Sequence, residues 1–285
     1  MIKFTNSFKP LALSTTLLLA GLVGGCGDSN NYGGGGYNGG GSNPSAGAGP
    51  TGGTCTGSAC VDLGTAANYS VLAESAITTT GTTVVNGNVG LSPAAKSDFG
   101  GWSQADDSTN TYATSVYVVA PGKMYASNHT GGTTPADLTL AIGHKDAAYA
   151  AAAAKPTPPT PVCPGTGAFD GTVVPALAPG VYTCAVNVTI PNSFTLNGSA
   201  TDVWVFQITG TLTQAANTQI ILTGGALPRN VFWQVSDVVA IGADAVMQGI
   251  VLGFSTISMG SGASVNGRLL GNTDITFIAN TVTLP

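Results

Sequence analysis

Short apolar segments recur along the C-terminal part of the chain, and in each a large aliphatic residue stands between two smaller or more polar ones. The segments are Asn187-Val188-Thr189, Thr211-Leu212-Thr213, Val238-Val239-Ala240, Thr256-Ile257-Ser258 and Asp274-Ile275-Thr276. Their aliphatic centres are 24, 27, 18 and 18 residues apart. Short strands repeated at such intervals are typical of a β-solenoid, in which each coil adds a strand to a growing parallel sheet.

Alternation within these segments predicts which side chains point outward, because successive residues of a strand face opposite sides. If the aliphatic centres fill the interior, their neighbours form two columns on a flat face that is nearly free of charge. An N-terminal copy, Ala76-Ile77-Thr78, adds to both columns with Ile77 inward. The outward residues are Ala76, Asn187, Thr211, Val238, Thr256 and Asp274 in one column and Thr78, Thr189, Thr213, Ala240, Ser258 and Thr276 in the other.

One long helix is predicted over residues 134–154, because Thr134 can cap it and Pro135 suits its first position. Its polar residues Lys145 and Asp146 are expected to face water. Its apolar stripe consists of Leu138, Ala141, Ile142, Ala148 and Tyr149. The stripe is expected to pack on the strand column that contains Phe206, Trp233, Val251 and Leu269.

Charged residues make up only 7% of the 285 residues, against roughly 25% in a typical soluble domain. The chain has 41 Gly, a single Glu (Glu74) and a net charge of −5. This composition suits a solenoid with tight corners and offers little material for acid–base catalysis. It also lacks the basic surface that nucleic-acid binding requires.

Residues 1–26 are predicted to be a lipoprotein signal peptide. Lys3 and Lys9 precede an apolar stretch at residues 11–23, which is shorter than the ~20 residues of a membrane helix. That length disfavours a transmembrane anchor, and an ordinary cleaved signal is the other alternative. Val23-Gly24-Gly25-Cys26 resembles the lipobox of bacterial lipoproteins, whose Cys is lipidated. Gly27 follows where Asp would favour inner-membrane retention.

We therefore expect an exported lipoprotein of the bacterial outer membrane or cell surface, or one released to the medium. Its contact with the membrane would be through the lipid anchor alone. Residues 27–58 are rich in Gly, Asn and Ser and predict a flexible tether. Residues 59–285 are expected to form one domain.

The remaining cysteines predict disulfides, because an even number in an exported chain favours pairing. They are Cys55, Cys60, Cys163 and Cys184. Three pairings are open, and Cys55–Cys60 with Cys163–Cys184 is preferred because each closes a local loop. A zinc site is the alternative, but neither His129 nor His144 has the spacing of a zinc ligand from a Cys pair. We expect no metal.

Over about residues 61–285 the order and spacing of several motifs resemble the microbial ice-binding protein family. Two of these motifs are Leu177-Ala178-Pro179-Gly180-Val181-Tyr182 and Asn230-Val231-Phe232-Trp233-Gln234-Val235. Further matching segments are residues 61–73, 75–78, 86–93, 134–138, 205–208 and 265–270. Each motif is weak alone, and their joint order carries the resemblance.

The resemblance implies a mainly β fold, a discontinuous right-handed β-solenoid of roughly triangular coils with one long α-helix packed alongside. It also implies a cap region, to which residues 99–132 contribute. A cap covers strand edges that would otherwise pair with another chain. Asp106 and Asp107 in this region could instead form half of a cation site, although adjacent acids in a loop are more often simply solvated.

The resemblance further implies that the flat face adsorbs to ice and inhibits growth and recrystallisation. Ice presents a repeating lattice, so area, flatness and stiff side chains such as Thr favour its binding. Val238 and Ala240 lack hydroxyl groups, and Asp237 and Asp274 bring charge to the face. We therefore expect ice binding without exceptionally strong activity.

The sequence disfavours two other classes of function. A polysaccharide-active enzyme needs clustered carboxylates or a calcium site, whereas Asp237 and Asp274 are expected two coils apart. We expect no enzyme activity and no cofactor. A cell-surface adhesin or carbohydrate-binding module needs exposed aromatic side chains, whereas Trp204 and Trp233 lie in core-like strands. We expect a monomer whose partner is the ice surface.

Overall fold

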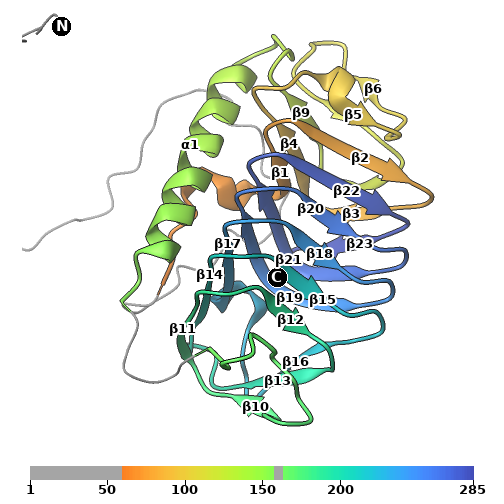
Figure 1. The fold of residues 1–285 in the computed structure, drawn as a ribbon. Helices are drawn as coiled ribbons and strands as arrows, with labels where there is room; N and C mark the ends of the chain where they lie inside the picture. Colours follow the sequence, from red (N-terminus) through yellow and green to blue (C-terminus); the bar gives the residue numbers. More distant parts are fainter. Residues whose placement is uncertain (1–59, 157–162) are drawn as a thin grey trace, which may run out of the picture. The chain divides into compact units, whose positions relative to one another are not determined.

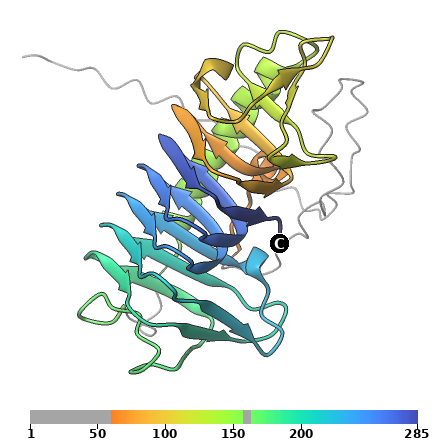
Figure 2. The ribbon, with the colours of Figure 1, turned by 90° about the vertical axis from the view of Figure 1, so that its right-hand side faces the viewer.

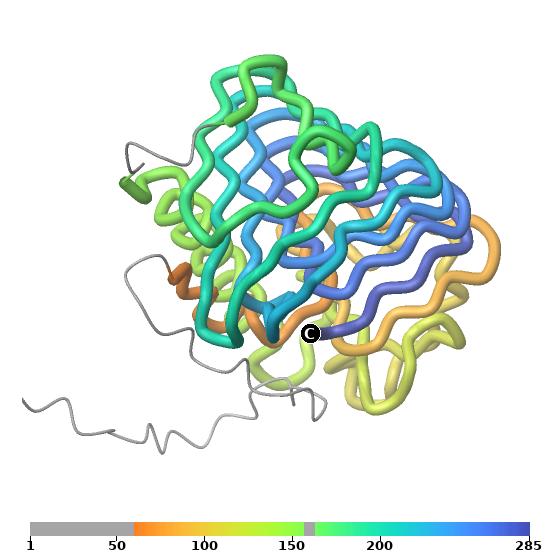
Figure 3. Tube along the Cα trace, turned by 90° about the horizontal axis from the view of Figure 1, so that it is seen from below, coloured from red at the N-terminus to blue at the C-terminus, as the bar shows by residue number. Residues whose placement is uncertain are grey.

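Parallel strands wind the chain into a stack of coils (Figure 1). The computed structural model describes residues 60–156 and 163–285. Seen along the stack, successive coils lie over one another and the long helix stands beside them (Figure 3). The predicted signal peptide, Cys26 and the tether lie outside the described residues. None of the helices in the described part of the chain has the length and apolarity of a membrane span.

The coils contribute strands to three sheets. Sheet B contains β12 (Val188–Ile190), β15 (Leu212–Gln214), β18 (Val239–Ile241), β20 (Ile257–Met259), β22 (Asp274–Ile278), β2 (Ala76–Thr80) and β5 (Phe99–Gly100), in that spatial order. Sheet C contains β10 (Ala176–Leu177), β13 (Phe194–Asn197) and β16 (Ile220–Thr223). The strands of sheet B stack one above another in Figures 1 and 2.

Sheet A is the largest of the three. Its main path is β11 (Gly180–Cys184), β14 (Trp204–Ile208), β17 (Val231–Val235), β19 (Val246–Gly253), β21 (Ser264–Gly271), β1 (Tyr69–Ala73), β4 (Asn88–Leu91), β9 (Met124–Ala126), β7 (Ala113–Thr114) and β6 (Ala105–Asp106). Beside this path, β23 (Thr281–Thr283) pairs with β21 and β3 (Val84–Asn86), and β3 pairs with β8 (Val118–Val119). Three short 3-10 helices complete the fold, η1 (Gly64–Asn68), η2 (Lys96–Asp98) and η3 (Pro228–Asn230).

The order of coils in space differs from their order in the sequence. The C-terminal strand β22 pairs with the N-terminal β2 in parallel, with Ile275 opposite Ile77. In sheet A, β21 pairs with β1, with Leu270 opposite Leu72. We call this junction of β21 and β22 with β1 and β2 the seam. It confirms the expected discontinuous solenoid.

A glycine pair lets the two longest strands bend between sides of the stack. Gly249 in β19 and Gly267 in β21 are paired and have φ of +109° and +157°. A Cβ on Gly267 would lie 1.7 Å from the carbonyl oxygen of Gly249. Only glycine allows this backbone and this closeness. The same strands can therefore serve two sides of the coil.

Helix α1 (Thr134–Ala153) packs on the outer side of sheet A, as Figure 1 shows. Its buried Leu138, Ala141 and Ala148 confirm the predicted stripe. The helix begins one residue earlier than expected from the cap assignment, because Thr133 rather than Thr134 is the N-cap. The helix packs on the expected strands, but it contacts different residues of these strands. Phe206, Trp233, Val251 and Leu269 point into the coil, and the helix packs on their neighbours Val205, Phe232, Ile250, Leu252 and Leu270.

The prediction for Lys145 is wrong. Its side chain is only 1% exposed and pairs with Glu74 and Asp146, whereas Asp146 does reach solvent. Lys145 also donates to the side chain of Asn272. An ammonium group can be buried when every donor has an acceptor, and two of these acceptors, Glu74 and Asn272, come from distant parts of the chain.

Both ends of the stack are covered. Residues 99–132, which begin with β5, lie at one end of the stack, as expected for the cap (Figure 1). At the other end, Phe169 makes stacked or edge contacts with Phe194 and Phe206, and its backbone N–H donates to the carbonyl of Thr189. This second cap was not expected from the sequence. It protects the edge of sheet B from pairing with another chain.

The predicted disulfide Cys163–Cys184 is confirmed, with a Cα–Cα distance of 5.1 Å. It ties the segment before Phe169 to the end of β11. Cys55 lies outside the described residues, so the pairing Cys55–Cys60 stays a prediction.

Candidate functional site

The outer face of sheet B is the candidate site, and its inner side is packed as the alternation predicts. The aliphatic centres of its repeated segments are at most 1% exposed. These residues are Ile77, Val188, Leu212, Val239, Ile257 and Ile275. Their neighbours are half-buried or exposed. The face is therefore made from the residues that flank each buried centre.

One column of the face follows the strand register without a break. Thr189 pairs with Thr213, Thr213 with Ala240 and Ala240 with Ser258. The column continues from Ser258 to Thr276 and from Thr276 to Thr78, across the seam. Residues from the two ends of the chain thus share one straight row.

The second column runs beside the starts of the same strands. Backbone N–H groups of the aliphatic centres donate to the carbonyls of Thr211, Val238 and Thr256 in the next coil, at 2.7–3.0 Å. The amide oxygen of Asn187 also accepts from the N–H of Thr211 at 3.1 Å. Asp274 and Ala76 complete the column as a register pair. The twelve predicted residues thus lie on one sheet face, and their role in binding stays a prediction.

The face extends one strand further than the sequence indicated. β5 adds Gly100 beside Thr78, and a Cβ at Gly100 would lie 3.0 Å from the Thr78 methyl group. Phe99 is the inward residue of this strand and is 5% exposed. A lone Phe-Gly pair has too short a pattern to predict a strand. At the far end of the strands, Thr80 pairs with the exposed Ile278.

Charge is sparse on this face. Among the outward residues of the described sheet B strands, Asp274 is the only charged one. The exposed Asp237 lies just before the strand β18, and its carboxylate accepts from the N–H of Val238 at 2.8 Å. Carboxylates hold strongly bound water of their own, so these two positions are the local irregularities of an otherwise neutral surface.

Buried polar side chains fix the corners at which the strands of sheet B end. Gln214 is 2% exposed and donates to the carbonyls of Thr218 and Val246. Asn280 is 1% exposed and donates to the carbonyls of Gly260 and Ala263. These bonds satisfy backbone groups that a tight corner leaves unpaired. They also hold neighbouring coils in a fixed register.

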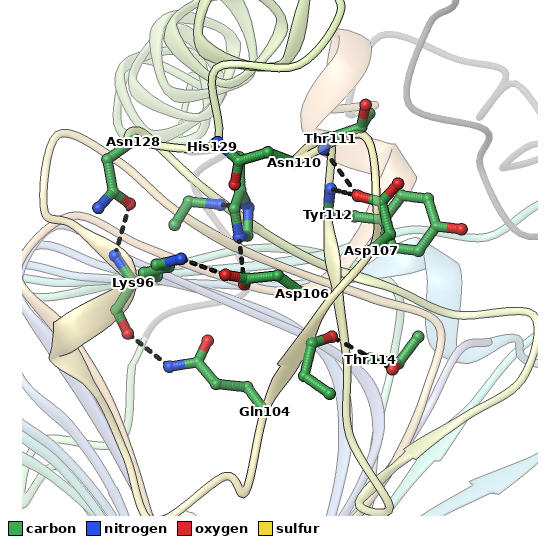
Figure 4. Close-up of polar contacts among 12 residues, drawn as sticks. Lys96, Gln104, Asp106, Asp107, Asn110, Thr111, Tyr112, Thr114, Asn128 and His129 are labelled. Carbon is green, nitrogen blue, oxygen red and sulfur yellow. Dashed lines mark hydrogen bonds and ion pairs between the residues drawn. The ribbon is translucent and has the colours of Figure 1, made fainter.

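The acidic pair Asp106 and Asp107 in the cap is occupied by contacts within the protein (Figure 4). Asp106 forms an ion pair with Lys96 and accepts a hydrogen bond from His129, whose Nε2 lies 3.3 Å from its carboxylate. The hydrogen bond from Lys96 lowers the pKa of Asp106. Asp107 accepts from Thr109, Thr111 and Tyr112, and the Thr109 hydroxyl contributes most to its lowered pKa.

His129 is a buried structural residue of this cap. Its Nδ1 accepts from the N–H of Ala126 at 3.0 Å, which leaves Nε2 as the protonated nitrogen facing Asp106. Burial lowers the pKa of His129 more than Asp106 raises it. Across residues 60–156 and 163–285, no group of three or more His, Cys, Asp or Glu could hold a metal ion.

Other shifted groups belong to the packed interior. Burial raises the pKa of Tyr182 to about 12 and lowers that of Arg268 to about 10. Tyr182 donates to the carbonyl of Ala178, and Arg268 donates to the carbonyl of Ala67. These contacts join segments of the fold and do not converge on a common site.

Comparison with known proteins agrees with this geometry. A family model described as ice-binding-like matches residues 71–283. The chain belongs to the ice-binding-like family. The match includes every strand of sheet B, so the face described above lies wholly within the family's region.

Relatives of this ice-binding-like chain come from fungi and bacteria. An ice-binding protein of Flammulina populicola is 38% identical over 229 residues, which are 80% of this chain and 90% of that protein. An ice-binding protein of a Colwellia species is 38% identical over 230 residues, or 80% of this chain and 85% of that protein.

Solved structures show the same fold. The ice-binding protein LeIBP from an Arctic yeast superimposes with a TM-score of 0.76 at 33% identity, covering 81% of this chain and 96% of that chain. A domain of ice-binding protein 1 from Shewanella frigidimarina superimposes with a TM-score of 0.69 at 27% identity, covering 79% of this chain and 97% of that chain. The predicted resemblance and solenoid fold are both confirmed.

Proposed function

We propose that this protein binds ice through the outer face of sheet B and inhibits crystal growth and recrystallisation. The observation that carries the proposal is the unbroken row from Thr189 to Thr78, in which one outward residue per coil repeats at the strand spacing. Membership in a family of ice-binding proteins supports the activity. The row and its neighbouring column supply the surface.

The physical argument rests on order before binding. A lattice offers many weak contacts, so a binder gains most when its groups are already fixed and lose little entropy. Thr side chains are stiff at χ1 and combine a methyl with a hydroxyl group. The buried corner residues Gln214 and Asn280 keep the coils from shifting. The face is therefore ordered before it meets ice.

Tyr substitution on the face tests the proposal. In Thr256→Tyr, the bulky ring would lift the face away from a flat lattice, so we expect sharply reduced freezing–melting hysteresis and recrystallisation inhibition. The matched control is Thr283→Tyr on β23, an exposed strand residue outside sheet B. We expect the control to retain activity and both variants to retain the circular dichroism of the parent. Full activity of Thr256→Tyr would place the site elsewhere.

Adsorption to ice requires no catalytic group, and we propose no enzymatic role. The adhesin alternative gains no support, because Trp102, Trp204 and Trp233 are all fully buried.

Residues 1–58 lie outside the described part of the chain. We keep the proposal that Cys26 is lipidated and that the tether presents the domain at the bacterial surface. Metabolic labelling with a radioactive fatty acid, compared between the parent and Cys26→Ser, tests it.

A further inference from the structure

Lys145 stands out as a buried ammonium group on helix α1. Its Nζ donates to Glu74 at 2.8 Å, to Asp146 at 2.7 Å and to the side chain of Asn272. An ammonium group has three N–H donors, so all of them are used. Burying a lysine is costly unless it is paired in this way. The position of these acceptors therefore indicates what the lysine does.

Two of the acceptors come from opposite sides of the seam. Glu74 follows β1 in the N-terminal coil, and Asn272 follows β21 in the C-terminal coil. The register pairs Leu72 with Leu270 before them and Ala76 with Asp274 after them. Glu74 and Asn272 therefore occupy equivalent corners of neighbouring coils, and a single side chain bridges them.

The backbone itself joins the two coils weakly at this corner. The N–H of Ser75 donates to the carbonyl of Thr273 at 3.4 Å, which is longer than the usual 2.7–3.2 Å. Asp274 and Ala76, the next register pair, already belong to the candidate face. The Lys145 bridge thus lies beside this long main-chain hydrogen bond and immediately before the face begins.

Other parts of α1 contact other coils. Gln207 of β14 donates to the carbonyls of Ala152 and Ala153 near the helix end, and the Tyr149 hydroxyl bonds that of Ser236 at 3.0 Å. Nearer the start, His144 accepts from the N–H of Thr65 at 3.0 Å. The helix is therefore held along its length without Lys145. The specific contribution of Lys145 is its double contact at the seam.

We propose that Lys145 is a positioning residue that holds β2 in register on β22, so that Ala76 and Thr78 continue the columns of the candidate face. The proposal rests on the ice-binding role of sheet B and adds that the face is continuous only while the helix bridges the seam. Lys145 itself does not touch ice.

Hydrogen exchange in the full chain tests the positioning role. Lys145→Met keeps the aliphatic stem and removes the donors. We expect about tenfold or greater loss of amide protection in β2, with protection in β15 and β18 within about threefold of the parent. Lys145→Arg, which keeps charge and donors, should retain most of the protection. Unchanged β2 protection in Lys145→Met, or an equal loss in every strand of sheet B, would overturn the proposal.

Two further variants complete this test. Lys123→Met is the matched control, because its ammonium lies 4.3 Å from the centre of the Tyr112 ring in the cap rather than at the seam. It should leave β2 protection unchanged, and an equal loss there would count against a seam-specific effect. If Lys145→Met does not fold, Glu74→Gln provides the milder change. A smaller loss confined to β1, β2, β21 and β22 supports the proposal, and no loss there overturns it.

Ice activity provides a second, separable readout. Thr213→Tyr and Thr78→Tyr should each reduce activity in the parent. In the Lys145→Met background, Thr213→Tyr should still reduce it, whereas Thr78→Tyr should add little because β2 is already displaced. Equal effects of Thr78→Tyr in both backgrounds would contradict the positioning role. If neither Tyr variant affects the parent, sheet B is not the ice site, and the exchange experiment alone decides whether Lys145 fixes the seam.

Discussion

Sheets A and B are built by the same coils, yet one is covered and the other is bare. The outward residues of sheet A include Phe232, Ile250 and Leu270, and helix α1 packs on them. The outward residues of sheet B in two of the same coils are Ala240 and Ser258, and no described element packs on them. The size and polarity of one residue per strand thus decide whether a side of the coil becomes core or surface.

This difference also separates stability from activity. The outward-facing residues of sheet A lie between the sheet and the helix, so truncating their side chains removes packing. The outward-facing residues of sheet B contact water, so truncating their side chains removes little packing. Substitutions on the two sheets should therefore divide into those that lower the free energy of unfolding and those that change the effect on ice.

The largest expected effect is on sheet A. Leu270→Ala should lower the free energy of unfolding by about 2–5 kcal/mol, because it leaves a cavity between β21 and the helix. Thr276→Ala on sheet B should change it by about 0.5 kcal/mol or less. Urea unfolding of the two variants measures both. Equal losses would mean that sheet B carries unrecognised packing.

The next effect concerns charge on the bare face. Asp274→Asn removes the only charged outward residue among the described strands of sheet B and nearly conserves its shape. We expect higher freezing–melting hysteresis, because a carboxylate organises water differently from ice. Asp244→Asn, an exposed corner residue, is the control and should leave the hysteresis as it is. A fall in activity with Asp274→Asn would show that the carboxylate contributes to binding.

A smaller gain is expected from completing the hydroxyl row. Ala240→Thr places a Thr between Thr213 and Ser258 in the register, and should raise recrystallisation inhibition modestly while changing stability by about 0.5 kcal/mol or less. Measurement of ice grain size over time at matched protein concentrations tests it. Lower inhibition would indicate that the row needs the shallow surface of alanine at this point.

The smallest effect should appear in the cap. Burial holds the pKa of His129 below its usual value, so the unfolded chain binds the proton more readily. The stabilising contribution of neutral His129 is present above about pH 6.5 and is lost as the pH falls below it. The lowered pKa of Asp106 acts in the same direction at lower pH. The protection of the β9 amides, relative to their intrinsic exchange rates at each pH, should therefore fall on acidification, and more in the parent than in His129→Gln.

Much of the fold could be predicted because the repeat is local. Val239, Ile257 and Ile275 show their inward position within three residues of sequence, and the intervals between them indicate the coil. The twelve outward residues follow from the same alternation. The apolar stripe of the helix could also be predicted from the sequence. On sheet A, however, the helix packs on the neighbours of the expected residues, which themselves point into the coil.

What could not be predicted depends on contacts between distant segments. Lys145 was expected in water because its acceptors Glu74 and Asn272 lie 71 and 127 residues away. Nothing in the local pattern shows that the seam brings these two together. The second cap around Phe169 was missed for the same reason. Its partners Phe194 and Phe206 become neighbours only after the coils have stacked.

Because helix α1 contacts several coils in succession, the length of the helix depends on the number of coils that it spans. A further coil of 18 residues, such as the interval between Val239 and Ile257, would widen the stack by about 4.8 Å. Gln207, which binds the helix end, and the Lys145 acceptors Glu74 and Asn272 would then lie farther apart by that amount, which is close to the rise of one helical turn. A chain that grows by one coil must also lengthen its helix by about three residues, so insertions of this kind should occur in pairs during divergence of such proteins.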